Sequence, residues 1–359
     1  MFGLLLFILG LVLLKFAGYE FRMGTHVKLY IFSQLAYLIT NRILFVCAAP
    51  ITTNYAFGNW IIALSTLAAG AAFYFVIEKS RFKVESPKYI LSKSTIEMLK
   101  FGIPLMPTTL IVWLNNSIAK FIYSMFGDYS SIGTFSIATS VANIFSIVPA
   151  AFTTYWAPYL YKNYKTEQKF IRRVHDYVVL SSVLLIIVFY VFQDILYIFV
   201  NGDYSSSKSI FMLVMINPVM SLLAETTGYG IMFEKKTVYN LYASAASFLL
   251  NAFITYFSYK YIGIVGAAVA IAVSSLLQFI IKTWIGQKYY KTIDSRLRTC
   301  ISIFVIMVIA ISNVYLCDNL LLRILISMSV MIIFTIIYKD FIKEIGHVIE
   351  KGVLLIRKG

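Results

Sequence analysis

Residues 162–173 read KNYKTEQKFIRR, and residues 175–200, just beyond them, read HDYVVLSSVLLIIVFYVFQDILYIFV. The second stretch is mostly apolar and is long enough to cross a hydrocarbon core about 30 Å thick as a helix. The first stretch is rich in Lys and Arg, and such short basic segments stay on the cytoplasmic side of a membrane. Together they predict a cytoplasmic loop followed by a transmembrane helix.

The same alternation recurs along the whole chain. Of its 31 Lys and Arg residues, 26 fall into six stretches between apolar runs: residues 15–28, 79–100, 162–173, 235–236, 282–298 and 339–358. The intervening gaps are residues 51–58, 127–131, 201–209, 259–263 and 317–320, and they hold only Lys208 and Lys260. This pattern predicts that the six basic stretches, including the C-terminus, are cytoplasmic and that the five gaps face outward.

Composition excludes a soluble protein. The 359 residues are 60% hydrophobic and 13% charged, with a mean hydropathy of +0.81, which leaves too little polar surface to cover a soluble domain. The net charge of +15 is therefore a signal of topology, and we expect no nucleic-acid partner. Because only helices or closed barrels satisfy the backbone in lipid and these runs are too long for barrel strands, we expect an all-α polytopic integral membrane protein with about 11 transmembrane helices.

The apolar runs place these helices in order along the chain. The predicted spans are residues 1–17, 27–50, 59–77, 99–126, 131–157, 175–200, 208–232, 237–258, 263–287, 299–317 and 320–338. An odd number puts the two ends on opposite sides, with Met1 outside. Residues 1–16 lack the charged start and small-residue cleavage site of a signal peptide. Either the first span inserts in reverse, or further spans precede it, and the charge pattern favours the second interpretation.

Polar residues at helical spacing mark faces of these spans that are costly to expose to acyl chains. The longest such stripe lies in residues 237–258 and consists of Asn240, Ser244, Ser247, Asn251, Thr255 and Ser258. Shorter sets are Thr109, Trp113, Asn116 and Lys120; Ser136, Ser140 and Asn143; Asn217, Ser221, Glu225 and Gly228; Ser275, Gln278 and Lys282; and Gln34 with Asn41. A single Ser or Asn is usually helix packing, whereas a stripe of this length indicates a water-filled cavity.

Charged residues inside spans are the second signal of a site. Arg42 lies about 12 Å from the end of its span at 1.5 Å per residue, which is farther than its side chain easily reaches toward water. Lys120 either reaches the interface or takes part in the site. Glu225 pairs with a cation elsewhere or carries a proton, and Arg323 is expected to be an interfacial anchor. The predicted substrate-cavity residues are Arg42, Asn41, Asn116, Lys120, Asn143, Glu225, Asn251 and Gln278.

Prolines within spans predict interrupted helices, which line substrates in many transporters and also occur in static bundles. The predicted hinges are Pro104, Pro107, Pro149 and Pro218. The Cys and His residues form no metal-ligand or disulfide spacing, and no extramembrane stretch is long enough for a catalytic domain. We therefore expect no metal, no cofactor and no enzymatic activity.

A series of short motifs resembles a known family. They are residues 100–107 (KFGIPLMP), Trp113, Phe126-Gly127, Ile132-Gly133, Trp156-Ala157-Pro158, residues 228–231 (GYGI), residues 234–237 (EKKT), Asn251 and residues 261–268 (YIGIVGAA). Their order and spacing over about residues 94–291 resemble the second lobe of Wzx-type polysaccharide-biosynthesis flippases, in the multidrug, oligosaccharidyl-lipid and polysaccharide exporter superfamily. Two features depart from the family: Ala119 stands where an acidic residue is common, and three spans, not six, precede this lobe.

The resemblance implies a domain division. Residues 1–78 correspond to the end of an N-terminal lobe, 79–98 to a cytoplasmic linker, 99–287 to a six-span C-terminal lobe, 288–338 to two additional spans and 339–359 to a basic cytoplasmic tail. The three spans of residues 1–78 have the orientation of the fourth to sixth spans of the family's first lobe. This match supports the expectation that upstream spans are missing.

The resemblance also implies a function. It is the transfer of an undecaprenyl-pyrophosphate-linked oligosaccharide, such as an O-antigen, lipopolysaccharide or capsule repeat unit, across the bacterial inner membrane by alternating access. The expected partners are this lipid-linked oligosaccharide, membrane lipid and the polysaccharide polymerase machinery. The alternatives are a cation-coupled small-molecule exporter of the same superfamily, a membrane-embedded polymerase or acyltransferase, and a non-functional remnant of a flippase.

Overall fold

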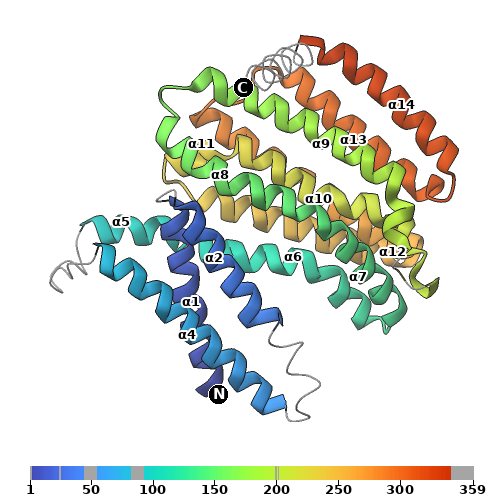
Figure 1. Ribbon diagram of the computed structural model, residues 1–359. Helices are drawn as coiled ribbons and strands as arrows, with labels where there is room; N and C mark the ends of the chain where they lie inside the picture. The colour runs from blue at the N-terminus through green and yellow to red at the C-terminus, as the bar shows by residue number, and fades with distance from the viewer. Residues whose placement is uncertain are drawn as a thin grey trace, which may run out of the picture. The chain divides into compact units, whose positions relative to one another are not determined.

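The computed structural model describes residues 2–23, 26–43, 55–81, 93–198, 200 and 202–340 (Figure 1). Within these ranges every regular element is a helix, and nine helices are long and apolar enough to cross a membrane. The chain is therefore an all-α, multi-pass membrane protein, as its composition predicts. It divides into two compact units: residues 1–92 with 154–162, and residues 93–153 with 163–359.

The first unit contains α1 (Phe2–Met23), α2 (Val27–Leu38), the π-helical turn η1 (Ile39–Ile43) and α4 (Tyr55–Arg81). Glycines let α1 and α4 approach closely. A Cβ atom on Gly10 would lie 2.6 Å from the Leu67 backbone nitrogen, and one on Gly70 would lie 2.6 Å from the Gly10 carbonyl oxygen. Small residues at a membrane helix interface permit this approach, so α1 and α4 form the packed pair of this unit.

The second unit contains the remaining helices. They are α5 (Lys93–Gly102), α6 (Leu105–Met125), α7 (Tyr129–Ala142), the 3-10 turn η3 (Asn143–Ser146), the start and last residue of α8 (Ile147–Asn163), α9 (Gln168–Tyr197), the 3-10 turn η4 (Gly202–Tyr204), α10 (Ser207–Thr227), α11 (Tyr229–Phe233), α12 (Val238–Tyr289), α13 (Arg296–Leu316) and α14 (Leu320–Ile337). Figure 1 shows α9, α13 and α14 running side by side, in agreement with their mutual contacts.

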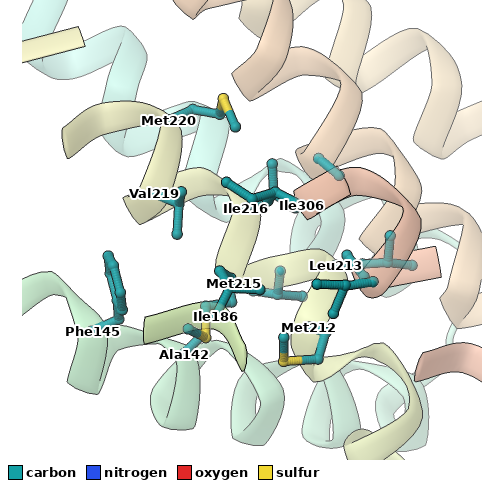
Figure 2. Packing of buried hydrophobic residues seen from close by; sticks show 14 of the residues in the cluster. Ala142, Phe145, Ile186, Met212, Leu213, Met215, Ile216, Val219, Met220 and Ile306 are labelled. Carbon is teal, nitrogen blue, oxygen red and sulfur yellow. The ribbon is translucent and has the colours of Figure 1, made fainter. Parts of the chain in front are cut away.

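The centre of this unit is α10, which is apolar on nearly all sides, as expected of a helix enclosed by others. Its side chains Met212, Leu213, Met215, Ile216, Val219 and Met220 are each at most 2% exposed. Figure 2 shows them among Ala142 of α7, Phe145 of η3, Ile186 of α9 and Ile306 of α13. The core of the unit is thus built around α10.

The longest helix, α12, is divided by a sharp kink. Gly263 has φ +52° and ψ −136°, a conformation that non-glycine residues rarely adopt. Beyond it the chain turns back, because Ser247 Oγ donates to the Ser274 carbonyl at 2.8 Å and Gln278 Nε2 donates to Ser244 Oγ at 2.8 Å. The two arms of α12 correspond to the predicted spans 237–258 and 263–287.

Several other predicted spans are interrupted. The span 99–126 breaks between α5 and α6 at Pro104, the span 131–157 contains η3, and the span 208–232 changes from α10 to α11 at Gly228. The span 27–50 is described only to residue 43, as α2 and η1. The remaining part of that prediction lies outside the described residues.

Candidate functional site

A polar bridge joins three helices near the middle of the second unit. Asn217 of α10 donates from Nδ2 to Asn116 Oδ1 of α6 at 2.8 Å. Asn217 Oδ1 in turn accepts a hydrogen bond from Ser275 Oγ, on the second arm of α12, at 3.1 Å. Asn116 is exposed and Asn217 is half-buried, so the bridge lies at an accessible surface of the unit.

Charged residues extend this surface in both directions. Lys120 follows Asn116 by one helical turn on α6, and Glu225 follows Asn217 by eight residues on α10, about 12 Å at 1.5 Å per residue. Tyr229 donates its hydroxyl to Glu225 Oε2 at 3.4 Å, and the Glu225 charge attracts the ammonium of Lys282 on α12. Six polar side chains on this surface are exposed or half-buried. We call them the α6–α10 polar face: Asn116, Lys120, Asn217, Ser221, Glu225 and Lys282.

The long stripe on the first arm of α12 has a different role. Its members Ser244, Ser247, Asn251 and Thr255 are each at most 1% exposed. Asn251 Nδ2 donates to the backbone carbonyl of Asn115 at 2.9 Å and to its Oδ1 at 3.0 Å, and Asn251 Oδ1 accepts from Thr255. The interpretation of this stripe as the wall of a water-filled cavity is wrong for these four residues, because they are buried and their polar groups bond to α6, to the second arm of α12 or to one another.

The other predicted cavity residues are placed as follows. Gln278 is half-buried and bonded to Ser244, so it belongs to the contact between the arms of α12. Asn143 begins η3 and is exposed. The side chains of Asn41 and Arg42 lie outside the described part of the chain. The polar face therefore unites Asn116, Lys120 and Glu225 from the prediction and adds Asn217, Ser221 and Lys282.

The predicted hinge prolines occupy two kinds of position. Pro104 precedes α6, Pro107 lies in its first turn, and Pro149 is the third residue of α8. These positions suit proline, since the first turn of a helix needs no backbone N–H donor. Pro218 lies inside α10, one residue after Asn217. It removes a backbone hydrogen bond beside the asparagine bridge, so this proline is part of the site's own geometry.

A charge cluster at the Ser207 end of α10 was not expected. Arg323 of α14 is 1% exposed and pairs with Asp194 of α9. Lys208 contacts Asp194 at 2.5 Å and Asp318 at 3.0 Å, and a cavity of about 570 Å³ lies beside these three charges. The expectation that Arg323 is an interfacial anchor is wrong, because its guanidinium is buried against α9. The isolated Lys208 in a gap poor in cations was the available signal for this cluster.

Comparisons with protein-family models, with curated proteins and with solved structures returned no match.

Proposed function

We propose that the chain is a transporter that moves an undecaprenyl-pyrophosphate-linked oligosaccharide across the bacterial inner membrane, with its C-terminus in the cytoplasm. The observation that supports this most is the α6–α10 polar face, in which amides, a hydroxyl and charges follow one another along otherwise apolar helices. Polar side chains inside a membrane commonly mark a substrate pathway. The family resemblance of residues 94–291 supports the same substrate class.

The chemistry of this face suits an amphiphilic substrate with a sugar headgroup. Asn116, Asn217 and Ser221 offer both donors and acceptors, which match sugar hydroxyls. Lys120, on the same helix face as Asn116, supplies a positive charge for a diphosphate. Large apolar side chains nearby, such as Trp113 and Leu110, each 58% exposed, suit a polyprenyl chain. In this proposal no covalent bond is made or broken, and the partners are membrane lipid and the polysaccharide polymerase machinery.

A specific observation also favours a second candidate, the cation-coupled small-molecule exporter. The charges of Glu225 and Lys282 attract each other within the predicted spans, and a carboxylate in such a setting can bind a proton or another cation. Glu225 would then bind the coupling ion, whereas in the first proposal its main role is to hold Lys282 and Tyr229 in place.

The deciding experiment reconstitutes the full chain in liposomes with fluorescent undecaprenyl-pyrophosphate-linked oligosaccharides and measures leaflet transfer by quenching from outside. We expect transfer above that of protein-free liposomes, and a reduced rate for Asn217→Ala. The matched control is Ser136→Ala, a substitution outside the polar face. Absence of transfer for a panel of glycans, together with dye efflux that requires a cation gradient, would support the exporter instead.

A further inference from the structure

Asp176, in α9, is a buried acid that lies outside the α6–α10 polar face. Its side chain is 1% exposed, and among the described residues neither carboxyl oxygen has a hydrogen-bond partner. It lies eight residues after α9 begins at Gln168, about 12 Å along the helix at 1.5 Å per residue. Since buried polar groups in proteins are almost always hydrogen-bonded, this carboxyl group requires an explanation.

In the described part of the chain, the charges around Asp176 do not form an ion pair with it. Arg298, on α13, and Asp294, just before α13, act on the carboxyl group in opposite directions. Arg298 directs Nη2 toward Asp340 Oδ2 at 3.6 Å and lies 5.8 Å from the centre of the Tyr338 ring. Arg298 thus divides its attraction between Asp176 and Asp340, and the negative charge of Asp294 opposes that attraction at Asp176.

The neighbouring histidine and tyrosine use their hydrogen-bonding groups elsewhere. His175 contacts Thr226 of α10 through Nδ1 at 2.7 Å and Thr299 of α13 through Nε2 at 3.1 Å. Tyr338, which follows α14 and is fully buried, shares its hydroxyl with Ser302 at 3.1 Å. On α9 itself, Arg172 precedes Asp176 by one turn, and its buried Nε also has no hydrogen-bond partner among the residues that the structure describes. The donors that pack near Asp176 from α9, α13 and α14 therefore leave its oxygens unbound.

The two protonation states of such a group differ greatly in free energy. An ionised carboxylate without hydrogen bonds in an apolar interior is strongly destabilised, and such groups usually become neutral instead. A neutral polar group left without a partner costs only about 1–3 kcal/mol. The geometry therefore favours the neutral acid in this arrangement of helices.

We propose that Asp176 is a proton-binding site that α13 and α14 cover. The carboxyl group holds its proton while these helices pack against α9, and it releases the proton to water when they separate from α9. Any movement of the α13–α14 pair would then be accompanied by proton release or uptake. This proposal rests on the packing of the second unit alone and does not depend on which substrate the protein carries.

Infrared spectroscopy of the full chain, carrying carbon-13-labelled aspartate, tests the proposal. At about pH 5, above the ordinary pKa of an aspartate, we expect a carbonyl band of a protonated aspartate that is lost in Asp176→Asn and kept in Asp318→Asn, a matched variant of a carboxylate that is 88% exposed. The band should also shift slowly in deuterated buffer. Absence of the band in the wild-type protein, its persistence in Asp176→Asn, or immediate exchange would each overturn the proposal.

A second variant keeps the test decisive if Asp176→Asn does not fold. Asp176→Leu replaces an unpartnered neutral acid with an apolar side chain of similar size, so we expect a Tm equal to or above that of the wild type. If Asp176 were instead an ionised partner of Arg298, its removal would take away a favourable charge interaction and lower the Tm. A lowered Tm in Asp176→Leu, together with a wild-type spectrum lacking protonated aspartate, would contradict a proton site.

Discussion

Arg323 in α14 pairs with Asp194 in α9 from a position where the guanidinium has almost no contact with solvent. Arg323 Nη1 also donates to the carbonyl of Tyr190 at 2.8 Å, so the side chain is fixed against α9. Lys208 continues the chain of alternating charges from Asp194 to Asp318. This arrangement explains how two cations are tolerated at one end of an apolar helix bundle.

Removal of the shared carboxylate should be costly. In Asp194→Asn, Arg323 and Lys208 both lose their common counter-charge. Because Arg323 is buried while Asp194 is 44% exposed, we expect a cost between the about 0–1 kcal/mol of an exposed pair and the about 3 kcal/mol of a buried one. We therefore expect a clear fall in the Tm of the purified protein, measured by intrinsic fluorescence in detergent. The control is Asp318→Asn, whose carboxylate is mostly exposed, since an exposed pair contributes only about 0–1 kcal/mol. Equal and small effects of the two substitutions would contradict this account.

Lowering the pH should reduce the Tm only slightly through protonation of Asp318. The hydrogen bond from Lys208 lowers the pKa of the Asp318 carboxyl group, so the folded protein binds this proton less readily than the unfolded chain. The stabilisation by this pair is present above the unfolded pKa and is lost as the pH falls through the folded one. In Asp318→Asn, this part of the dependence of Tm on acid pH should be absent.

Substitutions of two adjacent asparagines in α6 should distinguish an effect on helix packing from an effect on transport. Asn115 is 7% exposed and holds Asn251, whereas Asn116 faces the α6–α10 polar face and holds Asn217. We expect Asn115→Ala to lower the free energy of unfolding by about 1 kcal/mol, because Asn251 Nδ2 then loses one of its two buried acceptors and keeps only the Asn115 backbone carbonyl. Asn116→Ala should change the Tm little and reduce transfer of the lipid-linked oligosaccharide. The opposite assignment of effects would remove the polar face from the transport pathway.

The sequence predicts the helical class well because an apolar run must satisfy its own backbone in lipid. The predicted break between residues 258 and 263 also matches the kink at Gly263, since a short gap between two long apolar runs requires a turn. Helical spacing correctly groups Asn116 with Lys120, and Asn217 with Glu225, on their respective helices. These features depend on one segment at a time, and such local information is fully contained in the sequence.

What the sequence does not predict is which face meets another helix. The stripe around Asn251 and the face around Asn217 have similar spacing, yet the first is buried between helices and the second is accessible. Arg323 likewise has an acidic partner 129 residues away in the chain. Spacing gives the face on which a side chain lies, whereas its partner depends on the packing of helices distant in sequence.

The kink in α12 gives a fourth prediction. Gly263 has positive φ, and no atom of the described residues lies within 4 Å of the position of its missing Cβ, so a substitution there acts through the backbone alone. We expect Gly263→Ala to lower the free energy of unfolding by about 1–3 kcal/mol, the usual cost of a strained residue. Gly102→Ala is the control, because that glycine also has open space around it and no positive φ. Equal Tm values for the two variants would show that the turn between the arms tolerates side chains.

Topology can be tested by cysteine accessibility in a background without the native cysteines. The basic stretches predict that Ser94→Cys is cytoplasmic and that Ser205→Cys faces outward. An impermeant maleimide added to intact cells should label the second variant and reach the first only after the membrane is permeabilised. Labelling of Ser94→Cys in intact cells would reverse the predicted orientation of the chain, including its C-terminus.

The Glu225–Lys282 pair distinguishes the two transport proposals. Glu225→Gln keeps a side chain of the same shape but removes the charge that faces Lys282, and Glu225→Gln with Lys282→Gln leaves a neutral pair that can hydrogen-bond. If the protein transfers a lipid-linked oligosaccharide and the pair serves to position the polar face, the double variant should regain much of the transfer lost in the single one. If Glu225 binds a coupling cation, both variants should lose gradient-driven transport equally, because neither retains a carboxylate.

The comparison is made in liposomes with and without a proton or sodium gradient, with Tm confirming that each variant is folded. Recovery in the double variant without any dependence on the gradient supports the oligosaccharide transporter, and equal loss in both supports the cation-coupled exporter.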